Sequence, residues 1–168
     1  MWTTPKKPSS LEQRPAFVNT AEAFCAHIEE APSCERPVFV RLCFSLISKM
    51  LSEAMELPEV EGKLDAGNVS DERYNEIAQF LKAKFIDDDY YTMMFDPYEI
   101  AAEPVVGSLS DDLAGIWRGI KSGLESLNKG GLEDAVAQWR SSFAEQWGDQ
   151  ATQVLRPLSA LLLRDGQA

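Results

Sequence analysis

Thiol and imidazole groups, which catalysis and metal binding use often, are scarce in this 168-residue sequence. Cys25, Cys34 and Cys43 recur at intervals of nine residues, and His27 is the single histidine. On a helix, nine residues turn a side chain by about 180°, so successive cysteines would not converge on one zinc ion. An odd number of cysteines is typical of free thiols in a reducing compartment. We therefore expect no metal site, and we interpret His27 as a residue on a helix flank rather than a catalytic base.

Motifs for nucleophilic, phosphate-binding or metal-dependent catalysis do not occur in the sequence. It contains no Gly-x-Ser-x-Gly, no glycine-rich phosphate loop and no His-Glu-x-x-His. With 27 carboxylate side chains, pairs of acids arise by chance and do not indicate acid–base catalysis. We therefore assign no catalytic residue and no cofactor.

The acidic residues are the strongest chemical signal, because they are unevenly distributed. The net charge is −11, and residues 56–112 hold 15 acidic and four basic side chains, so all of the excess lies in this middle third. Solvation of loops and of acid-favouring helix N-termini is the simplest explanation. The alternatives are a docking face for a basic protein, a site for a hard cation, and mimicry of nucleic-acid phosphates. The run Asp87–Asp89 lacks the alternating spacing of an EF-hand loop.

Charge and hydropathy exclude several classes of protein. Direct binding to nucleic acid is not expected, because phosphate recognition requires a basic patch. Arg41 and Lys49 interrupt the most apolar stretch, Val38–Leu51, so we predict no transmembrane helix. The N-terminal lysines have no apolar segment behind them, and no signal peptide is expected. We expect a cytoplasmic protein that is a monomer or a weak dimer.

Most of the residues discussed above are expected to lie on helices. Apolar periodicity and capping residues predict a loop over 56–69 and helices over about 20–30, 37–55, 70–85 and 108–130. Because segment 37–55 is apolar on most faces, we predict that it is the central helix, with a strand over 38–47 as the alternative. The acidic and aromatic segment 87–98 is expected to form a short strand or irregular chain.

The C-terminal segment has the most regular pattern. One apolar sector of a helical wheel holds Leu132, Val136, Trp139, Phe143, Trp147, Val154, Leu158 and Leu161. This pattern predicts one long helix over about 132–163, bent near Pro157. Gln150 falls inside the apolar sector and therefore needs a polar partner or water. Arg140 borders the sector, and we expect it to pair with an acid of the middle third.

These elements predict an all-α fold, a single-domain bundle of about five helices with a long bent C-terminal helix. Residues 1–16, which are rich in proline and basic side chains, are expected to form a flexible arm. The helical domain is expected to cover residues 17–165.

Several segments resemble the uncharacterised bacterial family named domain of unknown function 5063. They are SLSDDLAGIWR at 108–118, DAVAQWRSSF at 134–143 and QWGDQ at 146–150, and shorter matches extend over nearly the whole chain. The resemblance implies a small cytoplasmic helical protein and brings no assigned activity. It also implies that histidines often flank the Trp147–Gly148 pair, where this chain has Gln146 and Gln150. Metal or acid–base chemistry based on such a histidine pair is therefore not expected here.

Two functional hypotheses follow. The first is a non-enzymatic interaction or adaptor module whose acidic face, residues 56–112, binds a basic partner protein. The second is a small-molecule-binding or hydrolytic enzyme with a carboxylate, arginine and tryptophan cleft between segment 87–98 and the C-terminal helix. The candidate binding residues are Asp87, Asp88, Asp89, Tyr90, Tyr91, Asp96, Asp111, Asp112, Trp139, Arg140, Trp147 and Gln150.

Overall fold

Helices make up most of the computed structural model, which describes residues 11, 13–64 and 67–166. The α-helices are α1 (Ala16–Glu29), α2 (Arg36–Ala54), α3 (Asp71–Lys84), α4 (Leu109–Gly130), α5 (Leu132–Ser142) and α6 (Gly148–Arg164). A short 3-10 turn, η1 (Ala31–Ser33), follows α1, and a π-helical turn, η2 (Phe143–Trp147), joins α5 to α6. The antiparallel strands β1 (Tyr90–Met93) and β2 (Val105–Ser108) precede α4.

This architecture confirms the all-α prediction. Because α5, η2 and α6 form one joined helix over 132–164, the bundle has five helical rods, as expected. The joined helix continues through Pro157, which lies inside α6. Segment 87–98 contains a short strand, β1, one of the two forms expected for it. Of the predicted N-terminal arm, residues 1–10 and 12 lie outside the described residues.

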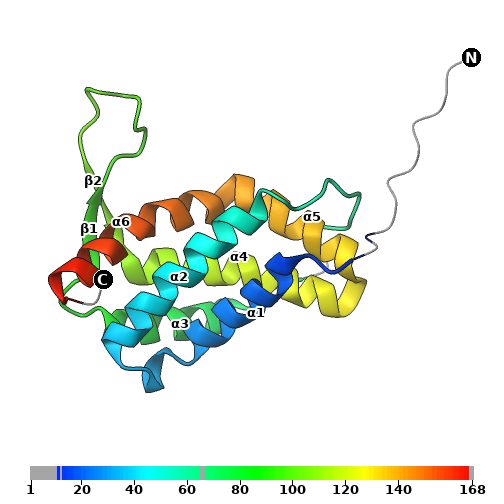
Figure 1. Ribbon diagram of the computed structural model, residues 1–168, viewed down its shortest axis with the longest axis horizontal. Helices are drawn as coiled ribbons and strands as arrows, with labels where there is room; N and C mark the ends of the chain where they lie inside the picture. Colours follow the sequence, from blue (N-terminus) through cyan, green and yellow to red (C-terminus); the bar gives the residue numbers. More distant parts are fainter. Residues whose placement is uncertain (1–10, 12, 65–66, 167–168) are drawn as a thin grey trace, which may run out of the picture.

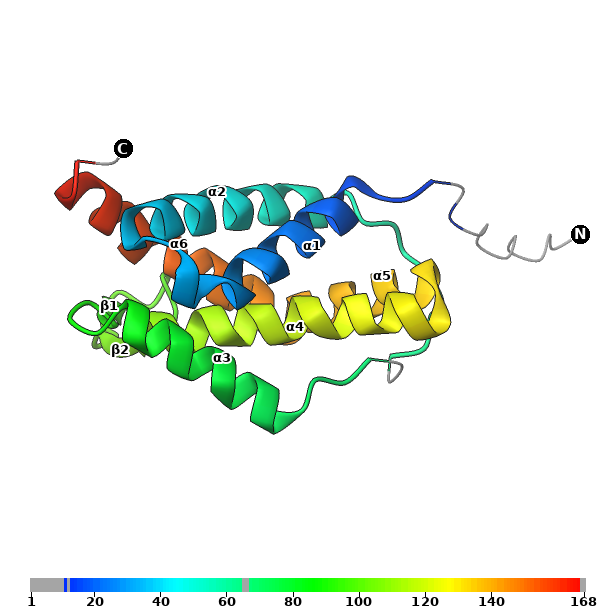
Figure 2. The same ribbon diagram turned by 90° about the horizontal axis from the view of Figure 1, so that it is seen from below.

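The central helix is α4, which contacts α1, α3, α5 and α6 (Figures 1 and 2). The prediction that segment 37–55 is central is wrong, although that segment is a helix and not a strand. α2 packs against α1 and α6, and it leaves Val38 and Leu42 exposed on its outer side. Its apolar composition therefore overstates its burial. Neither α2 nor any other helix in the described part of the chain is long and apolar enough to cross a membrane.

Two helices begin at serine caps: Ser70 for α3, and for α4 Ser108, one of the two serines, at 108 and 110, that the sequence offers. The backbone N–H of Arg73 donates to Ser70 Oγ at the start of α3, and that of Asp111 donates to Ser108 Oγ at the start of α4, both over 3.2 Å. Acidic residues occupy the first turn of each helix, where the helix dipole stabilises negative charge. At the other end of α4, Gly131 has a φ of 95°, a backbone conformation that favours glycine.

The π-helical turn η2 was not predicted from the sequence. In a uniform α-helix, residues eight apart point about 80° away from each other. The wider π turn ends at Trp147 and reduces this angle, so both indoles point into the core, where both are fully buried. Trp139 Nε1 donates to the carbonyl of Ile120 over 2.9 Å, and Trp147 Nε1 donates to the carbonyl of Trp139 over 3.1 Å.

The joined C-terminal helix packs against a row of glycines on α4. Gly115, Gly119 and Gly123 recur every four residues and therefore lie on one face of α4. A Cβ atom at these positions would meet the amide of Gln150, the ring of Trp147 and the ring of Trp139, respectively. The absent side chains are what allow the two helices to pack closely. The spacing of these glycines is visible in the sequence.

We predict that Gly123→Ala destabilises the protein more than Gly119→Ala does. A Cβ at position 123 would lie 2.0 Å from Trp139 Nε1, whereas one at position 119 would lie 3.1 Å from the Trp147 ring. Trp139 is held by its bond to Ile120 and by an edge contact with Phe17, so it has little room to move. The free energy of unfolding should fall by about 2–3 kcal/mol for Gly123→Ala, measured by urea denaturation. Equal losses in the two variants would contradict this account.

Candidate docking site at the hairpin

The hairpin, residues 87–108, projects from one end of the helical body (Figure 1). Its strands pair in the register Tyr90↔Ser108 to Met93↔Val105. It holds six acidic residues and no lysine or arginine. Several of its large apolar side chains are exposed, among them Phe95, Tyr98, Val106 and Ile100, which is 99% exposed. Apolar side chains that gather on a protruding segment are typical of an interaction surface.

Asp89 fixes the base of the hairpin to α4. It is only 4% exposed, and its carboxylate accepts hydrogen bonds from the Ser110 backbone N–H over 2.8 Å and from the hydroxyls of Ser108 and Ser110. Its backbone carbonyl accepts from the N–H of Leu109 over 2.7 Å. Asp89 therefore satisfies donors at the N-terminus of α4 and is not available to a partner.

A second attachment runs through Tyr91, whose hydroxyl donates to Asp112 Oδ2 over 2.7 Å. The Tyr91 ring lies against Gly107 on the facing strand, where a Cβ would come within 2.7 Å of the ring. Gln150 Nε2 contacts Asp112 Oδ1 at 3.4 Å, so the glutamine in the apolar sector has the polar partner that we expected. Burial raises the pKa of Asp112, and the bonds from Tyr91 and Gln150 oppose that shift. Burial and the bond to Asp112 also raise the pKa of Tyr91.

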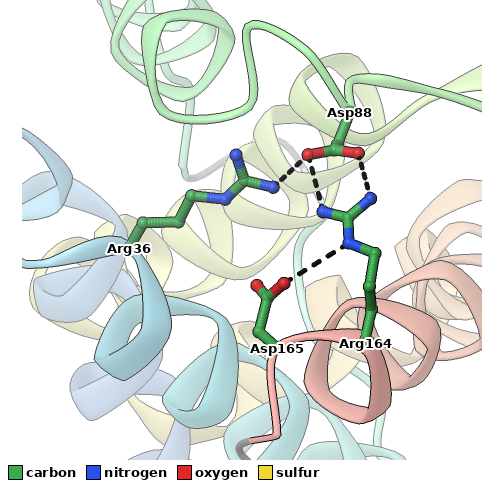
Figure 3. Close-up of polar contacts among 4 residues, drawn as sticks. All are labelled: Arg36, Asp88, Arg164 and Asp165. Atoms are coloured by element: carbon green, nitrogen blue, oxygen red, sulfur yellow. Dashed lines mark hydrogen bonds and ion pairs between the residues drawn. The ribbon is translucent and has the colours of Figure 1, made fainter.

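Asp88 joins three elements at the same end of the bundle (Figure 3). Its carboxylate binds Arg36 at the start of α2, and it accepts two hydrogen bonds from Arg164 at the end of α6, over 2.7 and 2.9 Å. Arg164 also donates to Asp165. The bonds from Arg164 and Arg36 hold the pKa of Asp88 well below its usual range. Asp88 is therefore a structural ion-pair partner, whereas its neighbour Asp87 is exposed.

The remaining predicted site residues are spread over the core, the bundle surface and the hairpin. Trp139 and Trp147 are core residues. Arg140 donates to the carbonyl of Leu57 over 2.6 Å and pairs with Glu59 at 3.6 Å, an acid of the middle third, as expected. Tyr90, Asp96 and Asp111 are exposed, and the Asp96 side chain accepts the Tyr98 N–H over 2.9 Å within the hairpin loop.

The acidic residues at 56–112 do not share one face. The loop before α3 lies beside α5, where the Lys63 N–H donates to Asp134 over 2.8 Å, and the hairpin lies at the opposite end of the bundle (Figure 1). Arginines from other segments also pair with acids of the middle third: Glu59 with Arg140, Asp71 with Arg118, and Asp88 with Arg36 and Arg164. The hairpin is the part of this region that has no basic side chain of its own.

A cavity of about 460 Å³ lies between the hairpin and α6. Its lining residues include Met93, Met94 and Phe95 on the hairpin side, and the charged residues of α6 that line it are Asp149 and Arg156. A cleft between segment 87–98 and the C-terminal helix was expected, but Asp96, Asp111 and Arg140 are not among the lining residues. The charged pair on α6 was not identified from the sequence, although its spacing of seven residues places both on one side of a helix.

The thiol and imidazole groups are packed into the core. Cys25 and Cys43 are buried, and burial raises the pKa of both thiols. His27 is 9% exposed, stacks on Phe39 and contacts its carbonyl at 3.0 Å, so it lies at the α1–α2 contact and not on an open flank. Burial lowers its pKa. Within the described residues, no three His, Cys, Asp or Glu side chains are placed to hold a metal ion.

Comparison with known proteins gives a family and a fold. The model of a domain of unknown function, DUF5063, matches residues 11–164. The crystal structure of protein BF1032 from Bacteroides fragilis is similar, with a TM-score of 0.73 and 26% sequence identity. The match covers 86% of this chain and 89% of that one. No curated protein matches the sequence.

We predict that Asp88→Asn lowers stability in a pH-dependent way. The folded-state pKa of Asp88 lies below its unfolded value, so its ion pairs stabilise the protein above about pH 4 and lose that effect as the pH falls further. At pH 7 the variant should unfold about 2–4 °C below the wild type, which corresponds to about 1 kcal/mol. Thermal denaturation from pH 3 to 7 measures the difference. Asp87→Asn is the control, and a difference that does not change with pH would contradict the ion-pair explanation.

We predict that Tyr91→Phe raises the pKa of Asp112. The Tyr91 hydroxyl bonds to the carboxylate and favours its charged form, so its loss should favour the protonated form further. Carbon-detected NMR titration of the Asp112 carboxyl group measures this shift. The matched control is Tyr90→Phe, which alters an exposed ring on the same strand. An unchanged Asp112 titration in Tyr91→Phe would show that the hydroxyl does not control this carboxylate.

Proposed function

The chain belongs to the DUF5063 family, and we propose that it is a non-enzymatic interaction module that binds a basic partner protein through its hairpin. The observation that carries the proposal is the combination of exposed apolar side chains with uncompensated acids on one protruding segment. The exposed acids of the hairpin are Asp87, Asp96, Glu99 and Glu103. Apolar contacts would supply affinity, and the acids would select a basic surface and speed association.

The structural roles of Asp88 and Asp89 narrow the proposed surface. Both carboxylates are occupied by groups of the chain itself, so their removal would disturb the bundle as well as any binding. The four exposed acids lie outside these bundle contacts, so their neutralisation tests binding with little effect on the helical body; Asp96 bonds within the hairpin loop, to the Tyr98 N–H. Asp96 and Glu99 neighbour the exposed Phe95 and Tyr98 in the sequence, so acidic and apolar side chains share the hairpin loop, and a polar rim around an apolar centre is common in protein interfaces.

The alternative function is a small-molecule-binding or hydrolytic enzyme that uses the cavity between the hairpin and α6. The cavity itself favours this alternative, because its volume suits a small ligand. Its lining, however, brings together no nucleophile with a neighbouring base, and its two charged side chains are Asp149 and Arg156. We therefore favour the interaction module.

We predict that neutralising the exposed acids of the hairpin abolishes salt-sensitive partner capture. The variant is Asp87→Asn, Asp96→Asn, Glu99→Gln and Glu103→Gln. Immobilised protein is exposed to an extract of its own cells and washed at increasing salt. Wild type should release its partner as salt rises, because exposed charges are screened over about 8 Å at physiological ionic strength.

A matched control has four exposed acids neutralised away from the hairpin: Glu35→Gln, Glu56→Gln, Glu61→Gln and Glu72→Gln. It has the same net charge as the hairpin variant, so it separates a local effect from a general one. The control should retain the partner, and the hairpin variant should not. Equal capture by both variants, or capture that does not respond to salt, would refute the proposal.

A further inference from the structure

The cavity beside the hairpin continues along α6. A second cavity of about 280 Å³ shares Tyr91, Thr92 and Arg156 with the first and extends to Arg164. Together the two cavities run from Asp149 to Arg164, which is about 22 Å of helix at 1.5 Å per residue. This groove would hold an extended segment of about six or seven residues.

The groove lies beside β1 and not beside β2. Its lining includes Tyr90, Tyr91, Thr92 and Met93, which make up β1, and no residue of β2. β2 pairs with β1 along one edge. Among the described residues, the backbone of β1 has no bonded neighbour strand on its second edge. Such an edge carries N–H and C=O groups that can pair with another strand, and β1 has no lysine or proline to block that pairing.

The side chains that line the groove indicate which side chains a bound extended segment should have. Met93, Met94 and Phe95 offer an apolar wall, which suits an apolar side chain of the segment. Asp149 and Arg156 are seven residues, or about 10 Å, apart on α6. In the described residues Arg156 has no ion pair or side-chain hydrogen bond, so its charge is available. A segment with a basic and an acidic side chain on one face, two to four positions apart, would complement this pair.

We propose that the groove between β1 and α6 binds an extended segment of the partner protein, which adds to β1 as a third strand. The proposal rests on the proposed function for the identity of the partner as a basic protein. Backbone hydrogen bonds to β1 would supply affinity, and the α6 charges would supply selectivity. A second copy of the chain is disfavoured as the occupant, because its hairpin would bring six acids and no base toward a segment of the same charge.

The test uses a library of random seven-residue peptides displayed on phage and selected on the wild-type protein. Affinities of the selected peptides are then measured by fluorescence anisotropy. Thr152→Trp fills the groove from its α6 side, and Gln146→Trp is the matched control at an exposed position of the joined helix outside it. Asp149→Lys reverses one groove charge, and Glu72→Lys makes the same change of charge on α3.

We expect selected peptides to be enriched in lysine or arginine, and Thr152→Trp and Asp149→Lys to weaken their binding about tenfold or more. The controls should stay within about twofold of the wild type. A peptide whose basic residue is replaced by glutamate should regain affinity for Asp149→Lys. Backbone amides of β1 should become protected from hydrogen exchange in the complex, a change that binding to the hairpin loop alone would not cause.

Three results would overturn the inference: no enriched peptide, affinities that Thr152→Trp does not change, or unchanged exchange in β1. Phe95→Ser with Ile100→Ser tests the hairpin loop separately. If those changes remove salt-sensitive capture while the groove variants do not, the proposed function stands and the third-strand inference fails. Dimerisation of the wild type that Thr152→Trp abolishes would identify a second copy as the occupant and would also refute the inference.

Discussion

The close approach of α4 and the C-terminal helix is the constraint on which the rest of the structure depends. Gly115, Gly119 and Gly123 leave room on α4 for side chains that arrive from the facing helix. The indoles of Trp139 and Trp147 fill two of these positions, and both rings satisfy their N–H groups inside the core. The two large rings bury much apolar surface where they pack against glycine. The π turn that ends at Trp147 keeps both rings on the same side of the C-terminal helix. The other helices then pack around this pair.

The same contact determines where the hairpin stands. The remaining glycine of the row, Gly115, lies against Gln150, and the Gln150 side chain reaches Asp112 in the first turn of α4. Asp112 also accepts the hydroxyl of Tyr91, so the position of β1 depends on the α4–α6 contact. A second tie, through Asp88, holds the hairpin base to α2 and to the end of α6. The base of the projecting loop is therefore attached to α2, α4 and α6.

The sequence predicted the features that local chemistry determines, such as the serine caps of α3 and α4 and the long C-terminal helix. It could not separate Asp87, Asp88 and Asp89, because their roles are decided by partners at positions 36, 110 and 164. The central helix was misassigned for a related reason: composition measures how apolar a helix is, whereas centrality depends on how closely its neighbours approach. The pairing of Gln150 with a polar group followed from the cost of burying an amide.

The acidic residues of the middle third differ in whether the fold pairs them or leaves them exposed. Away from the hairpin, arginines meet acids of the middle third, so much of that charge is balanced where it lies. Within the hairpin no basic side chain exists, and the carboxylates of Asp88 and Asp89 are used by the bundle. What remains exposed is a small set of acids on the same segment as several exposed aromatic and aliphatic side chains. Acids repel a second identical hairpin and attract a basic surface, so under the proposed function the exposed charge, which the fold does not use, would select the partner.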